Sequence, residues 1–185
     1  EWYEQANYFS DYVVGMTANE VLKIKTTEKD GKKIAAEDII TAGCTVDISN
    51  FIAAVIEGCD DPKAKKFKSA SYNLGLGVDT VLSDQSKDGE KVQFDISISA
   101  AVTDKSDKVI ALVTDAAEPE IEFDDKDKEK VATKREQGND YGMKEYSPIK
   151  KEWYEQADAY SEYATGLDLT GIKSINPNDE YLKAG

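Results

Sequence analysis

The segment Ala42-Gly43-Cys44-Thr45, followed by an apolar helix predicted over residues 49–59, is the part of the sequence best suited to chemistry. A glycine lets a phosphate approach backbone amides closely, and the N-terminus of a helix just downstream stabilises the phosphate charge. Asp47 would lie near such a phosphate and repel it. The alternative is a buried strand–turn–helix connection, in which the side chain of Ser49 or Asn50 caps the helix.

Few other residue types in the chain could support catalysis. The sequence contains no histidine, which removes the Ser/His/Asp and Cys/His nucleophilic arrangements and the usual zinc ligands. A mostly helical stretch separates Cys44 from Cys59, which places the two thiols ~15–20 Å apart and beyond the reach of a disulfide. We therefore expect both cysteines to be free and buried.

The motif at residues 42–45 resembles the Ser-Gly-Ala-Thr motif of FMN-binding domains. This family includes the C subunit of sodium-pumping NADH:quinone oxidoreductases and the G subunit of Rnf complexes. Gly43 and Thr45 match the motif, while Cys44 stands where the family has alanine. Ala42 replaces the serine of the motif, and Asp47 replaces a second hydroxyl residue.

The resemblance implies a flavin cofactor. In the family, the hydroxyl of the final threonine carries FMN through a phosphoester that a flavin transferase installs. Carried over to this chain, the attachment residue is Thr45, and the candidate cofactor-binding residues are Gly43, Cys44 and Thr45.

A long internal repeat sets the organisation of the chain. Residues 1–16, EWYEQANYFSDYVVGM, return as EWYEQADAYSEYATGL at residues 152–167. The period from Glu1 to Glu152 is therefore 151 residues, which is the size of a domain and not of a solenoid unit. We predict one full module over residues 1–151, with helices in 1–68, a sheet in 69–125 and a connector in 126–151, and the start of the next repeat at 152–185.

The repeated segment has the apolar spacing of a helix, which Gly15 would close in the first copy. The following Thr17-Ala-Asn-Glu20 is a capping-box sequence and predicts a second, short helix. In the second copy, Asp168 is the candidate cap of the corresponding helix.

Residues 70–123 have the pattern of an antiparallel sheet. Apolar and polar residues alternate from Val92 to Val102, and turn sequences flank this run on both sides. One apolar and one polar face is typical of an antiparallel sheet that helices cover on one side. We predict an α+β fold, in which helices at residues 1–24 and 49–59 pack on a curved antiparallel sheet.

Most of the chain takes part in a broader resemblance. The alternating strand, the segment Asn139-Asp-Tyr-Gly-Met143 and the Glu-Trp-Tyr-Glu-Gln helix are similar to exported FMN-binding-like repeat proteins of gut bacteria of the Clostridia type. The resemblance implies a location outside the cytoplasm, at the cell surface or secreted. It also implies that a flavin-loaded module would exchange electrons with a redox partner protein.

Three other patterns could bind ligands. Asp84 to Asp95 follows the spacing of a calcium loop, but strands and not helices are expected on either side, which favours an ordinary β-turn. Gly75-Leu-Gly77 lacks the third glycine of a dinucleotide fingerprint. Aromatic residues of the two repeat helices could stack on a flavin ring or a sugar, but at helical spacing they more often form core: Trp2, Tyr3, Phe9, Tyr12, Trp153, Tyr154, Tyr160 and Tyr163.

The charge of the chain excludes several partners. A net charge of −14 argues against nucleic acid and against an anionic membrane surface. Because the sequence has no run of about 20 apolar residues, we expect membrane attachment only through a lipid anchor or signal outside this chain. The absence of an initiator methionine and of a signal peptide suggests a piece of a longer protein.

Two functions therefore stand beside each other. One is an exported electron carrier with FMN on Thr45, in which the protein orients the flavin and supplies no catalytic group. The other is a non-catalytic surface or lipoprotein module with a degenerate flavin site, which binds a small ligand or a protein partner. A calcium-stabilised, adhesin-like repeat is a third alternative.

Overall fold

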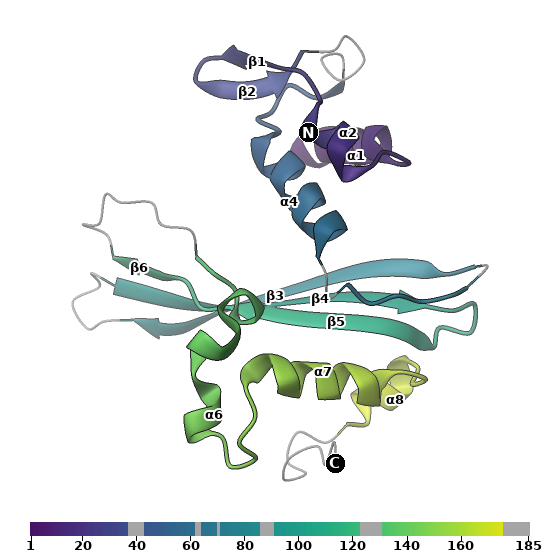
Figure 1. Cartoon of the computed structure of the whole chain (residues 1–185), viewed down its shortest axis with the longest axis vertical. Coiled ribbons are helices and arrows are strands. Elements are labelled where there is room, and N and C mark those ends of the chain that lie inside the picture. Colours follow the sequence, from purple (N-terminus) through teal and green to yellow (C-terminus); the bar gives the residue numbers. More distant parts are fainter. Residues whose placement is uncertain (37–42, 62–63, 70, 86–90, 123–130, 176–185) are drawn as a thin grey trace. The chain divides into compact units, whose positions relative to one another are not determined.

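The computed structural model describes residues 1–36, 43–61, 64–69, 71–85, 91–122 and 131–175 (Figure 1). The chain divides into two compact units, Glu1–Ala64 and Lys65–Gly185. Both units combine helices with antiparallel strands, which confirms the α+β class. The boundary between the units lies at residues 64–65, whereas the second copy of the sequence repeat begins at Glu152. None of the described helices is long and apolar enough to cross a membrane.

The first unit is a small helical body with one β-hairpin. Its core contains Phe9, Val21, Ile24, Ala35, Cys44 and Ile48. Its elements in chain order are α1 (Trp2–Val13), α2 (Ala18–Leu22), β1 (Thr26–Lys29), β2 (Lys32–Ala35) and α4 (Ser49–Asp60). The hairpin has no counterpart among the elements predicted from the sequence, because its short strands carry no apolar alternation.

Most of the local signals in the first unit are confirmed. Gly15 has a positive φ of 86° directly after α1, and Thr17 and Glu20 form the predicted capping box of α2. The predicted cap of α4 is wrong. Ile48 occupies the N-cap position, and the carboxylate of Asp47 accepts the amide hydrogen of Ser49 at 2.8 Å. A carboxylate just before the helix satisfies that amide with a charge-assisted hydrogen bond.

The second unit is built on a four-stranded antiparallel sheet. The alternating run predicted from the sequence is the central strand, which pairs with β3 on one side and with β5 and β6 on the other. The strands are β3 (Asn73–Gln85), β4 (Lys91–Thr103), β5 (Val109–Ala117) and β6 (Glu120–Glu122). Leu76 lies opposite Ala100, and Ala101 lies opposite Leu112.

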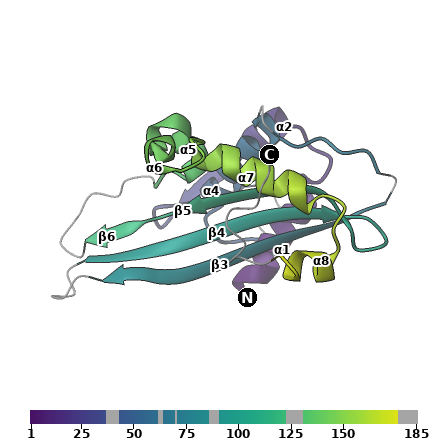
Figure 2. The same cartoon turned by 90° about the horizontal axis from the view of Figure 1, so that it is seen from below.

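Helices follow the sheet in the second unit, and the longest covers one sheet face (Figure 2). They are α5 (Lys134–Gln137), the 3₁₀ helix η1 (Gly138–Tyr141), α6 (Met143–Tyr146), α7 (Trp153–Ala164) and α8 (Leu169–Lys173). Val109 and Leu112 of β5 form a small core with Ala164 of α7. The second copy of the aromatic helix therefore packs on the sheet that precedes it in sequence. The predicted Asp168 cap of α8 is confirmed by its hydrogen bond to the amide of Gly171.

Candidate functional site

The loop that carries the flavin-like motif is fastened to α1 by one side chain. The amides of Thr45 and Val46 donate to Oε1 of Gln5 at 2.7 and 3.2 Å. The Thr45 hydroxyl donates to the same oxygen at 3.1 Å. Gln5 belongs to the first copy of the repeated helix, so these hydrogen bonds join that helix to the motif loop. Ala42 lies outside the described residues, while Gly43, Cys44 and Thr45 are described.

An aromatic ring leaves no room for a side chain at Gly43. A Cβ atom at this position would lie 2.5 Å from Cγ of Tyr8 and 2.6 Å from both Cδ atoms. Such distances are below any real carbon contact, so a larger residue would force the ring or the loop to move. The Tyr8 ring of α1 therefore fills the space that a side chain at position 43 would occupy.

Cys44 is a core residue and not a nucleophile. Its side chain is fully buried between the hairpin and the helices of the first unit. Burial raises the pKa of the Cys44 thiol, and a hydrogen bond with the Val46 backbone only partly opposes this. The thiol therefore stays protonated at neutral pH. Both cysteines are free, as predicted, but Cys59 is exposed and not buried.

Asp47 places a carboxylate beside the first amides of α4. Its carboxylate accepts hydrogen bonds from the amide of Ser49 at 2.8 Å and from the amide of Lys33 at 3.3 Å. Hydrogen bonds with Ser49 hold the pKa of Asp47 below its usual range, so the group is ionised at neutral pH. A fixed negative charge thus lies two residues from Thr45, at the N-terminus of α4.

Among the described motif residues 43–45, Thr45 is the one whose side chain is exposed. Its hydroxyl contacts the amide oxygen of Gln5, which is not basic enough to remove a proton. No base among the described residues is hydrogen-bonded to this hydroxyl.

The aromatic residues of α1 divide between core and surface. Phe9 is buried and contacts the ring of Phe51 with centroids 5.4 Å apart, as a core position requires. Trp2 and Tyr3 are 61% and 59% exposed, so the prediction that they form core is wrong. Trp2 meets Phe51 with its edge at 5.8 Å, and the rest of the indole remains accessible.

The remaining ligand candidates gain little support. Gly75 and Gly77 lie within β3, and a Cβ at either position would meet only a carbonyl oxygen of β4 at ordinary contact distance. The backbone does not approach closely there, and no helix follows as a dinucleotide site requires. The calcium-like sequence from Asp84 to Asp95 falls partly outside the described residues, and its last five positions belong to β4.

A buried charge cluster in the second unit escaped sequence reasoning. Lys134 is 9% exposed, and its ammonium pairs with Glu118. The same ammonium lies 4.9 Å from the ring centroid of Tyr141 and 5.7 Å from that of Trp153. Burial alone would lower the pKa of Lys134, but hydrogen bonds with Glu118 and Tyr141 outweigh it, and the net pKa is raised. The capping sequence Thr133 to Glu136 indicates a helix here. It does not indicate that the Lys134 side chain points toward Glu118.

Arg135 continues this cluster toward the aromatic helix. Its Nη2 donates to Asp158 of α7 at 3.0 Å, and its Nε donates to the carbonyl of Thr114 in β5. The backbone amide of Arg135 also donates to Asp115. The cluster therefore joins the connector to both α7 and the sheet, which is a structural role.

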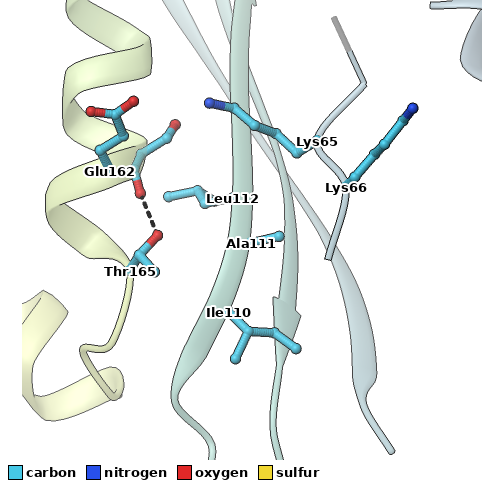
Figure 3. A pocket seen from close by; sticks show the side chains of 8 residues that line it. Lys65, Lys66, Ile110, Ala111, Leu112, Glu162 and Thr165 are labelled. Atoms are coloured by element: carbon cyan, nitrogen blue, oxygen red, sulfur yellow. Dashed lines mark hydrogen bonds between the residues drawn. The ribbon is translucent and has the colours of Figure 1, made fainter. Parts of the chain in front are cut away.

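A pocket of about 200 Å³ lies between β5 and α7 (Figure 3). Its residues are Lys65, Lys66, Ile110, Ala111, Leu112, Ser161, Glu162 and Thr165. Figure 3 shows the Lys65 side chain directed toward α7 and the Lys66 side chain directed away. Lys65 is 3.9 Å from Asp158, and Glu162 adds a negative charge at the pocket wall. Ligand sites usually enclose about 300–1,000 Å³, and with nearly balanced charge this pocket has no evident anion preference.

No family model, curated protein or solved structure matches the chain in comparisons with known proteins.

Proposed function

We propose that the chain is a non-catalytic module of FMN-binding-like architecture, located outside the cytoplasm, whose flavin site is degenerate and whose role is to bind a protein partner. The observation that carries this proposal is the position of Asp47. Its ionised carboxylate already accepts the Ser49 amide at the start of α4, which is the group that would otherwise stabilise a phosphate.

The rest of the loop supports a structural role. Gln5 holds two backbone amides and the Thr45 hydroxyl, and Cys44 contributes to the core. Gly43 makes room for the Tyr8 ring. Gly43, Cys44 and Thr45 thus each have a partner within the protein that accounts for the residue type.

One observation favours the second candidate, an electron carrier with FMN on Thr45. The Thr45 side chain is exposed on a loop that Gln5 holds in place, so a transferase could reach the hydroxyl without unfolding the unit. In that case the chain would pass electrons between the flavin and a redox partner protein, and the Asp47 charge would disfavour the reduced, anionic flavin.

Co-expression of the chain with a flavin transferase separates the two candidates. We expect a colourless protein of unmodified intact mass. A matched variant that restores the family motif, A42S/C44A/D47T, should become yellow and gain the mass of a phosphoester-linked FMN. Adding Thr45→Ala to that variant should remove both changes. A yellow wild-type chain, whose added mass disappears in Thr45→Ala alone, would establish the electron carrier instead.

A further inference from the structure

We propose that α1 is a docking surface for the β-sheet of another module of this repeat. The occupant is a sheet of the β3–β5 type together with its connector, and it binds the side of α1 that carries Ala6 and Ser10. This side is called the docking row below. The proposal names the partner of the binding role given above.

The second copy of the helix shows what this side is built to contact. In α7, the residues that match the docking row are Ala157 and Ser161, and they are 8% and 2% exposed. Ala164, one turn further along, is fully buried against Val109 and Leu112 of β5. Small residues at this spacing let the helix backbone lie close to the sheet.

The docking row of α1 has the same local geometry but is buried less, since Ala6 is half-buried. Val13, the counterpart of Ala164, packs against the core of the first unit. The Ser10 hydroxyl donates to the carbonyl of Ala6 at 2.9 Å, just as the Ser161 hydroxyl donates to the carbonyl of Ala157 at 2.8 Å. Ser10 is nevertheless exposed, whereas Ser161 is buried. The surface is therefore already formed in the conformation that accepts a sheet.

The N-terminal ends of α1 and α7 also differ in exposure. Glu152 is 5% exposed at the start of α7, and the Trp153 ring beside it is half-buried next to Lys134 of the connector. Their counterparts Glu1 and Trp2 are exposed. A connector like residues 131–151 would cover that end of α1 as it covers the same end of α7.

The turn after the helix supplies a backbone contact. Gly166 has a φ of 89°, its amide donates to the carbonyl of Val109, and the Val109 amide donates to the carbonyl of Leu167. Gly15 has nearly the same φ, 86°, at the matching position in the first unit. Both copies therefore have a glycine of the same conformation after the helix, and the turn of the second copy makes two backbone hydrogen bonds to β5.

Sequence identity selects the occupant. Residues 1–6 are identical to residues 152–157, and the serine of the docking row is also retained. A foreign protein or a lipid surface would not require this identity in a helix that has a separate core function through Phe9 and Gln5. A sheet of the same repeat does require it, because it must accept both copies.

The experiment fuses a second copy of residues 65–151 directly before Glu1 of the full chain, so that a Lys151–Glu1 bond reproduces the natural Lys151–Glu152 bond. In a Trp153→Phe background, Trp2 is the only tryptophan of this protein, because the chain has two and the added segment has none. Acrylamide quenching of Trp2 is compared with that of the unfused Trp153→Phe chain, and Trp153 in an unfused Trp2→Phe chain is the reference.

We expect quenching of Trp2 to fall to the level of Trp153, and the α1 amides to gain hydrogen-exchange protection. Ser10→Glu should abolish both effects in the fused chain while leaving the unfused chain folded, because Ser10 is exposed there. The proposal is overturned if Trp2 stays as accessible as before, or if circular dichroism shows that the added segment remains unfolded. Neither readout depends on the flavin mass, so the proposed function can fail separately.

Discussion

The two aromatic helices begin with the same residues and have the same length, yet the residues that they bury most deeply differ. Helix α1 turns Phe9 into a core made with the hairpin and α4, and leaves Ser10 exposed. Helix α7 turns Ser161 and Ala164 toward the sheet, and leaves Tyr163 51% exposed. A repeated sequence thus fixes the helix and its caps, while the neighbouring elements decide which side becomes core.

A single repeated glutamine shows the same division in chemical terms. Gln5 uses its carbonyl oxygen to accept hydrogen bonds from the Thr45 loop. Gln156 uses its amide nitrogen to donate to the Met143 sulfur, the Ser147 hydroxyl and the Lys151 carbonyl. One side chain can serve as acceptor in one unit and as donor in the other, because an amide has both groups.

The largest expected effect comes from the core side of α1. Phe9→Ala should destabilise the first unit by about 3–5 kcal/mol, because it empties a fully packed aromatic site. The matched Tyr160→Ala should lower the free energy of unfolding of the second unit clearly less, since Tyr160 is only half-buried. Hydrogen exchange in α4 and in β4 reports the two units separately. Equal losses in both units would contradict the contrast between the two helices.

The charge cluster that is joined to α7 should respond to mutation and to alkaline pH. Lys134→Met leaves Glu118 without its partner and should destabilise the second unit by about 1–3 kcal/mol. Because the pKa of Lys134 is raised on folding, its contribution is complete below the unfolded pKa of about 10.4 and is lost as pH rises through the folded pKa.

Urea unfolding at several pH values measures this contribution. The stability difference between wild type and Lys134→Met should be constant near neutral pH and should shrink at strongly alkaline pH. The matched control is Lys144→Met, an exposed lysine of the same connector, which should have little effect at any pH. A difference that grows with pH would show that the sign of the pKa shift is wrong.

The smallest effects are expected from substitutions of the two repeated glutamines. Gln5→Glu keeps an acceptor for the Thr45 and Val46 amides and should change stability by less than about 0.5 kcal/mol. Gln156→Glu removes the donor from the Ser147 and Lys151 contacts and should cost about 1 kcal/mol. Thermal unfolding of the two variants would refute the assigned roles if Gln5→Glu were the more damaging substitution.

Signals that act within a few residues were readable from the sequence. The repeat helices, the Thr17 capping box, the Asp168 cap and the alternating strand all depend on local spacing, and all are present. The pairing of the 26–35 hairpin left no such trace, because both strands have four residues and neither alternates between apolar and polar residues. The predicted caps of α4, Ser49 or Asn50, are wrong because only the geometry shows that the Asp47 carboxylate accepts the Ser49 amide hydrogen.

The contacts of the candidate site residues could not be predicted from the sequence. Sequence reasoning located Gly43, Cys44 and Thr45 and recognised Asp47 as a disturbance. It could not show that Gln5, forty residues earlier, holds the loop, or that the Tyr8 ring fills the space beside Gly43. Such contacts join residues distant in sequence, as does the pair of Lys134 with Glu118. Side-chain direction within a helix decides them.

Strand β3 has a consequence for handling the protein at high concentration. It is the terminal strand in the order of the sheet, it is 13 residues long, and Leu74, Leu76 and Val78 are 60–72% exposed on it. A long open edge of this kind can recruit strands from other molecules into ribbons. The net charge of −14 opposes such growth by mutual repulsion, so the acidity of the chain acts as a colloidal stabiliser whose strength declines with ionic strength.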